Sequence, residues 1–314
     1  MINQRWKTMR QKQRLQNRDK SKTIRTVTPI TFIVLFFLAW SLDLWANSSG
    51  VPVPKLPVFN KADAKAFGLQ LAKYADIFDT GWRDQFSKST MRLFDGGGDS
   101  VDRKVTQTLL EGSSGDKSMV RFMSPAEIRG VGALVHENPA ATDDSWLYLP
   151  SNRKVSRVSG ANRTASFQGT EFTYEDLSTI IVRRYDWRFL GEDSVTVDGR
   201  SQKVYKVEAK PTYKDTGYSK LVIFLNQNYW RVEKISFYDK AGQSLKTLSN
   251  GEWQQLHGRF WRAYRTEMAN HQTKKRTVIE IKSLFLNLSK YKRKDGSARK
   301  NLTDQHFTKR SLEK

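Results

Sequence analysis

Few residues of this chain have the types and spacing that catalysis requires. No G-x-S-x-G elbow is present, and the run Gly96-Gly97-Gly98 lacks the Lys-Ser/Thr of a phosphate-binding loop, so a hairpin turn explains it better. The histidines lie in four separate segments and form neither an HExxH motif nor an H-x-H pair: His136, His257, His271 and His306. The sequence therefore supports no zinc site, and we expect no enzyme, no metal and no cofactor.

Acidic residues are the remaining catalytic candidates. Neighbouring acids at 143–144, 175–176 and 192–193 read as solvated turn residues rather than a general acid-base pair. An Asp-Thr-Gly triplet occurs at Asp79 and at Asp215, as in an aspartic protease, but such a dyad needs buried flanks and Asp215 lies in a polar run. A hydrolase is the weakest hypothesis.

A basic strip follows the strand-like segment 145–150. Arg153 and Arg157 would face the same way on a strand, with Lys154 between them. Arginine pairs in bidentate fashion with phosphate or carboxylate, so the strip could contact lipid headgroups or an acidic partner. A solvated edge that protects the sheet from aggregation is the alternative.

The N-terminal region is built like a secretory signal. Residues 1–29 form a basic leader with an excess of about eight positive charges, and Thr26–Leu42 is uncharged and apolar. Residues 30–46 are therefore either the core of a cleaved signal peptide or an uncleaved membrane anchor, and a buried core helix is the remaining alternative, which rarely follows such a basic tail. Both alternatives export the rest of the chain, which would be soluble in the periplasm or tethered to the inner membrane by residues 26–46.

The exported part is strongly basic. The whole chain carries a net charge of +22, of which about +15 belongs to residues 47–314. Such a charge favours an anionic membrane surface or an acidic protein as partner, although it could also serve solubility alone. Export argues against nucleic acid. The chain has no cysteine, which excludes disulfides and a lipid-modified N-terminal cysteine.

Hydrophobic periodicity predicts a mainly β domain. Residues 47–60 form a Pro-rich linker, and 61–78 have helical periodicity, with Phe67, Leu71, Tyr74 and Phe78 on one face. Alternating patterns then run to residue 289, with turns at 95–99, 112–116, 198–199, 226–228, 239–242 and 250–251. Residues 290–314 form a basic C-terminal tail that we expect to close the domain.

The alternation also predicts how the domain is built. We expect 61–289 to form a strongly curved antiparallel half-barrel sheet of about ten strands, with an N-terminal capping helix and a short helical or irregular insert at 171–184. One face of the sheet is aliphatic and aromatic, and the other is largely charged. The curved sheet encloses either a filled core or a cavity.

Several linear segments resemble one protein family. They include YADIFDTGW, the Ser89–Leu93 strand, RGVGALVHEN, DDSWLYLPSNRKVSRV, SFQGTEFTYEDL and the closing FTKRSLEK, and they span residues 71–314. These segments resemble the periplasmic outer-membrane lipoprotein-sorting (LolA-like) family, in the branch associated with transporters of the resistance-nodulation-division type. The long basic leader and basic tail depart from a freely diffusing carrier.

The resemblance implies a half-barrel that shields the acyl chains of lipoproteins or lipids in an apolar cavity for transfer toward the outer membrane. The alternative is a membrane-tethered accessory module of an inner-membrane resistance-nodulation-division transporter, without lipid cargo. Leu147 and Leu149 would serve as well as Trp146 and Tyr148. The lining candidates are Val120, Phe122, Trp146, Tyr148, Tyr205, Val207, Ile223, Leu225, Phe260, Tyr264, Ile279 and Ile281.

Overall fold

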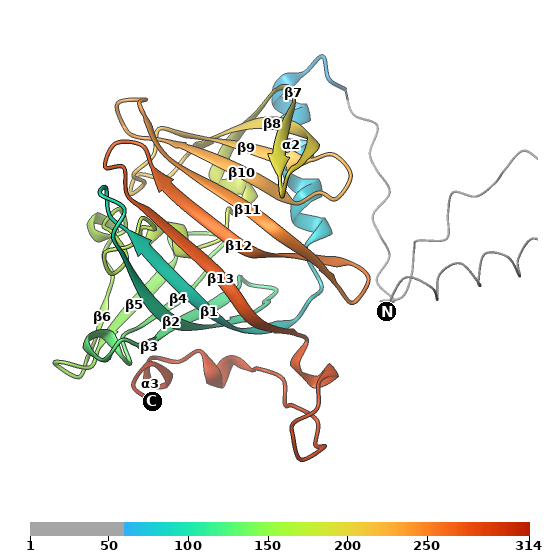
Figure 1. Ribbon diagram of the computed structural model, residues 1–314. Helices are drawn as coiled ribbons and strands as arrows, with labels where there is room; N and C mark the ends of the chain where they lie inside the picture. The colour runs from blue at the N-terminus through green and yellow to red at the C-terminus, as the bar shows by residue number, and fades with distance from the viewer. Residues whose placement is uncertain (1–59) are drawn as a thin grey trace, which may run out of the picture. The chain divides into compact units, whose positions relative to one another are not determined.

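One open sheet of 13 strands makes up most of residues 60–314, the part of the chain that the computed structural model describes (Figure 1). The strand order is β6-β5-β4-β3-β2-β1-β13-β12-β11-β10-β9-β8-β7, and all neighbours are antiparallel. The pairing of β1 with β13 joins the early and late strands in mid-sheet. The predicted leader, the signal or anchor segment and all but the last residue of the predicted linker lie outside the described residues.

The strands have the following bounds: β1 Asp84–Phe94, β2 Ser100–Leu110, β3 Lys117–Ser124, β4 Gly132–His136, β5 Asp144–Leu149, β6 Lys154–Arg157, β7 Tyr185–Val197, β8 Arg200–Pro211, β9 Lys220–Asn226, β10 Val232–Tyr238, β11 Ser244–Leu256, β12 Phe260–Asn270 and β13 Arg276–Leu286. This open antiparallel sheet confirms the predicted mainly β fold.

Most predicted turns connect strands, but one does not. The turns at 95–99, 112–116, 198–199, 226–228 and 239–242 each join two consecutive strands. The predicted turn at Asn250-Gly251 is wrong, because both residues lie within β11. Glu252 has a positive φ of 52°, and the pairing with β12 keeps the same register on both sides of it, with Gly251 opposite Arg265 and Trp253 opposite Ala263. A Cβ at Gly251 would lie 2.7 Å from the Asp198 carboxylate, so glycine permits this close approach.

Helix α2 (Ala64–Phe78) lies against one half of the inner face of the sheet. Asp63 caps its first turn by accepting from the backbone N–H groups of Lys65 and Ala66. Phe67, Leu71 and Tyr74 are buried, which confirms the predicted apolar stripe. Gly68 brings the helix close to β7, since a Cβ there would lie 2.6 Å from the backbone nitrogen of Phe189.

The segment 158–184 crosses the inner face of the other half. It contains only 3-10 turns, namely η2 Gly160–Asn162, η3 Glu175–Leu177 and η4 Val182–Arg184. Phe167, Tyr174 and Leu177 pack on Met91, Val105 and Phe122 of strands β1 to β3. The irregular insert predicted at 171–184 is therefore present, and with its preceding residues it fills this half of the concavity with protein side chains.

The C-terminal segment packs on the outer face. It includes η5 Leu288–Lys290, η6 Asp304–His306 and the short helix α3 Lys309–Leu312. Phe307 and Leu312 are buried against Met119 and Leu134, with Trp146 and Tyr148 beside them. No helix within residues 60–314 is both long and apolar enough to cross a membrane.

Candidate functional site

A cavity of about 1080 Å³ remains between α2, the sheet and residues 179–183. Its floor is apolar and includes Val207, Ile223 and Leu225 from β8 and β9. Leu69, Ala72, Ala75 and Phe78 of α2 form one wall, and Ile180, Ile181 and Val182 form another. This volume lies at the upper end of ligand pockets, which are typically about 300–1000 Å³. The space can accommodate an apolar chain.

An arginine stacked among aromatic rings forms one corner of the cavity. The Arg231 guanidinium lies 4.8 Å from the Tyr229 ring, 4.6 Å from the Trp253 ring and 4.5 Å from the Trp261 ring. Its Nε donates to Glu233, which also accepts from the indole Nε1 of Trp253. Glu233 therefore positions both Arg231 and Trp253 at this corner.

Acidic side chains gather at the cavity rim. Glu111 accepts hydrogen bonds from the backbone N–H groups of Gly81 and Arg83, and Asp116 accepts from that of Gly112. Burial raises the pKa of Asp116 to about 6, and the nearby Glu137 and Glu111 add to that rise. Burial also raises the pKa of Glu137. Both carboxyl groups are therefore easier to protonate than ordinary acids.

Two contacts fasten the insert over the cavity. Glu137 accepts a hydrogen bond of 2.7 Å from the backbone N–H of Thr179. Arg184 donates from both terminal nitrogens to Asp143, at 2.9 and 2.6 Å, and also to the backbone carbonyl oxygen of Asn138. Burial alone would raise the pKa of Asp143, but the hydrogen bonds from Arg184 and the Asn138 backbone outweigh it and the pKa is lowered. The carboxylate therefore stays charged and holds residues 178–184 against the β4–β5 loop.

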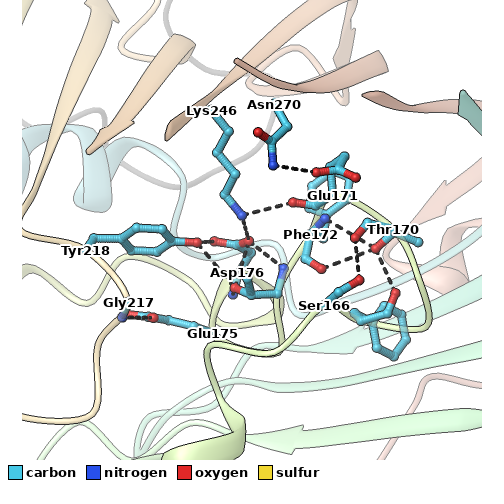
Figure 2. Close-up of polar contacts among 12 residues, drawn as sticks. Ser166, Thr170, Glu171, Phe172, Glu175, Asp176, Gly217, Tyr218, Lys246 and Asn270 are labelled. Atoms are coloured by element: carbon cyan, nitrogen blue, oxygen red, sulfur yellow. Dashed lines mark hydrogen bonds and ion pairs between the residues drawn. The ribbon is translucent and has the colours of Figure 1, made fainter. Parts of the chain in front are cut away.

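A buried polar cluster fixes the insert to the sheet from inside (Figure 2). The Lys246 Nζ on β11 donates to Asp176 Oδ2 at 2.6 Å and to the backbone oxygen of Glu171 at 2.9 Å. Asp176 also accepts from the hydroxyl of Tyr218, and Glu175 accepts from the backbone N–H of Gly217. Within the segment SFQGTEFTYEDL, Glu171, Glu175 and Asp176 thus hold the insert in place.

The predicted lining residues divide among three places. Val207, Ile223 and Leu225 line the cavity, and Tyr205 packs beside them against Trp230. Trp146 and Tyr148 lie on the outer face against the C-terminal segment, so Leu147 and Leu149 are the inward residues of β5. The others lie on the inner face outside the cavity lining, where side chains pack on them: Val120, Phe122, Phe260, Tyr264, Ile279 and Ile281.

The basic strip does not form the predicted row on one strand. Arg153 has a positive φ of 52° and lies in the turn before β6, so it is not in register with Arg157. Arg157 pairs with Asp144, and Lys154 is exposed on the edge strand. The alternation rule failed here because β6 begins one residue later than the strip. Contact of these residues with headgroups or a partner stays a prediction.

Sequence reasoning missed most of the cavity walls. The aromatic corner comes from β-strand ends and turns, where periodicity gives no inward or outward direction. The cluster of tryptophans and tyrosines between residues 229 and 261 was the signal available, because such large side chains are on average highly buried.

Solved structures with the same fold identify the family. A domain from Vibrio parahaemolyticus assigned to outer membrane lipoprotein sorting is 32% identical over 80% of this chain and 100% of its own length, with a TM-score of 0.72. This chain belongs to the LolA-like, outer-membrane lipoprotein-sorting family. A family model described only as that of an uncharacterized protein matches residues 114–314. The association with transporters stays a prediction.

Other LolA-like structures agree in fold. A DUF1329 family protein from Desulfovibrio piger is 26% identical, with a TM-score of 0.70, and the match covers 80% of this chain and 99% of that one. A LolA superfamily protein from Nitrosomonas europaea is 19% identical with a TM-score of 0.57, covering 78% and 98%, and it shows the fold alone. No curated protein matches the chain.

Proposed function

We propose that this LolA-like protein is a periplasmic carrier that shields the acyl chains of lipoproteins or lipids during transfer toward the outer membrane. The cavity of about 1080 Å³ carries the proposal, because it remains open beside an inner face that is elsewhere filled by side chains. Its apolar floor and walls suit a hydrocarbon chain, and its charged rim suits a polar headgroup at the surface.

Binding would follow from burial alone. Each methylene moved from water into an apolar site contributes about 0.8 kcal/mol, so a chain of about 14 carbons gains on the order of 10 kcal/mol. Ordering the chain offsets part of that gain. Release then requires either an acceptor that binds the acyl chain more tightly or a displacement of residues 178–184 of the insert. No nucleotide hydrolysis or other catalysis is needed.

The alternative proposal is a tethered accessory module of a resistance-nodulation-division transporter. It would use the same fold without cargo, and the predicted anchor at 26–46 would keep it at the inner membrane. Its cavity would remain empty in the cell, which separates it from the carrier.

Native mass spectrometry of the full exported chain, purified from the expressing cells under conditions that keep bound lipid in place, tests the two proposals. A carrier should show additional masses that organic extraction removes and that lipid analysis identifies as acylated species. After extraction, the chain should regain a fluorescent fatty acid with one-to-one stoichiometry. A chain that is always empty and does not take up the fatty acid would overturn the carrier and favour the module.

A further inference from the structure

Residues 290–300 form a projecting β-hairpin, here called the basic hairpin (the red loop beyond the end of β13 in Figure 1). Lys292 bridges to Ala298, and Arg293 donates from its backbone N–H to the oxygen of Ser297 at 2.7 Å. Gly296 occupies the turn with a φ of 82°, and Asp295 accepts from the Ser297 N–H and hydroxyl. The local hydrogen bonds give the segment a defined conformation.

The charge of the basic hairpin is almost entirely positive and unpaired. Its six cations face a single acid, Asp295, whose carboxylate is engaged by Ser297. Within residues 60–314 the ion pairs nearest in sequence, Lys282–Glu280 and Lys117–Asp304, both fall outside it. Most of its side chains are exposed. The cations are Lys290, Lys292, Arg293, Lys294, Arg299 and Lys300.

The base of the basic hairpin is fixed beside the cavity. The fully buried Asp84 accepts from the backbone N–H of Leu288 with one carboxylate oxygen and from that of Leu302 with the other, both at 2.7 Å. Trp82 and Gln85, on either side of Asp84 in the chain, line the cavity. Tyr291 and Arg299 also pack on the Phe285 ring of β13. The hairpin therefore keeps one position relative to the cavity rim.

We propose that the basic hairpin is an electrostatic docking arm that places this rim against an anionic phospholipid surface. Clustered lysines and arginines that form no ion pair are attracted to such a surface, and a bilayer requires no complementary shape. The rim acids are engaged within the protein: Glu111, Asp116 and Glu137 are partly buried and accept from backbone N–H groups, and Asp79 pairs with Arg262. The membrane contact itself does not depend on the carrier function. Only the transfer of lipid at that contact rests on the proposed function.

A single dye on the full chain can test the contact. The chain has no cysteine, so Ala298→Cys places a polarity-sensitive dye on the basic hairpin, and Ala241→Cys, in the exposed β10–β11 turn, is the matched site away from it. We expect vesicles with phosphatidylglycerol to shift the emission at 298 and protect it from an aqueous quencher. Vesicles of phosphatidylcholine alone should not, and added NaCl should weaken the response.

Removal of positive charges shows whether the basic hairpin or the overall positive charge of the protein causes the response to vesicles. In the 298-labelled chain, changing Lys292, Arg293, Lys294 and Lys300 to Gln should weaken the response to anionic vesicles by at least about tenfold. The same change at the exposed Lys104, Lys214, Lys274 and Lys275 should weaken it much less.

Several results would overturn the proposal: equal effects of the two sets, a response to phosphatidylcholine vesicles as large as to anionic ones, or a stronger response to polyglutamate or DNA. The hairpin variant should still carry lipid in native mass spectrometry. Loss of docking with lipid retained thus separates this proposal from the carrier function.

Discussion

Lys246 of β11 and Asp176 of the insert form a buried ion pair, with Nζ and Oδ2 2.6 Å apart and side chains only 2% and 6% exposed. The Lys246 ammonium also lies 5.4 Å from the ring centroids of Tyr218 and Phe237. The pair joins β11 to a segment 70 residues earlier in the chain. It is one of the contacts that tie the irregular insert to the regular sheet.

Asp176→Asn should destabilise the fold by about 3–5 kcal/mol, because it leaves the buried Lys246 charge without its partner. Adding Lys246→Met removes that charge, so the double variant should be more stable than the sum of the single changes predicts. Urea unfolding of the four proteins measures the coupling. Strictly additive losses would show that the two side chains act independently.

Ala75→Trp should reduce lipid binding, because residue 75 lines the cavity from α2 and an indole would occupy the space of the acyl chain. Ala66→Trp, on the exposed side of the same helix, is the matched control and should bind like the wild type. Titration with a fluorescent fatty acid gives the affinities, and we expect at least about a tenfold difference. Equal affinities would place the ligand elsewhere.

Stability should fall as pH rises through about 6, because the folded-state pKa of Asp116 is raised above its usual value. A raised carboxyl pKa means that the protonated form is favoured in the fold, so the contribution is complete below pH 4 and lost above 6. Asp116→Asn should abolish this part of the pH dependence and, after allowance for solvent screening, stabilise the protein at pH 8 by about 1–2 kcal/mol. Unfolding at pH 5 and pH 8 provides the check, with Asp99→Asn in the exposed β1–β2 turn as control. An unchanged pH profile in Asp116→Asn would contradict the assignment.

Arg184→Lys should loosen residues 178–184 without unfolding the sheet. Lysine keeps the charge but cannot reproduce the two parallel bonds to Asp143 and the bond to the Asn138 carbonyl. Hydrogen exchange of the 178–184 amides should accelerate about tenfold or more, while β9 and β10 stay protected. The exposed Arg188→Lys serves as control. If exchange rises equally throughout the domain, Arg184 supports the whole fold and not the insert alone.

Gly68→Ala should destabilise the protein although alanine favours helix. The new methyl group would meet the β7 backbone at 2.6–2.8 Å, which costs about 1–3 kcal/mol of overpacking against up to about 1 kcal/mol of helix propensity. Thermal unfolding measures the net loss. The exposed Ala66→Gly change tests propensity alone, and a stabilised Gly68→Ala variant would show that the helix can move away from the strand.

The sheet and its covering helix could be predicted because their signals are local. Alternation between polar and apolar residues, hairpin turns and the stripe of α2 each depend on neighbours in sequence. The close contact at Gly251 could not be found this way, since the carboxylate that requires glycine belongs to Asp198 in another hairpin.

The cavity itself was harder to predict than the fold. The inward direction of Val207, Ile223 and Leu225 follows from strand alternation. The filling of the opposite half by Phe167, and the outward direction of Trp146, depend on segments that return from far along the chain. An apolar face alone does not say whether the protein or a ligand will cover it.

The close approach of α2 to β7 at Gly68 has a mechanical consequence. Because α2 contacts the β7 backbone directly at Gly68, it cannot rotate or slide without steric clash. This wall of the cavity is therefore fixed. Residues 178–184 of the insert, opposite, contain a single 3-10 turn and are held by polar contacts of Arg184 and Glu137. A ligand wider than the cavity opening must therefore displace residues 178–184 and not the helix.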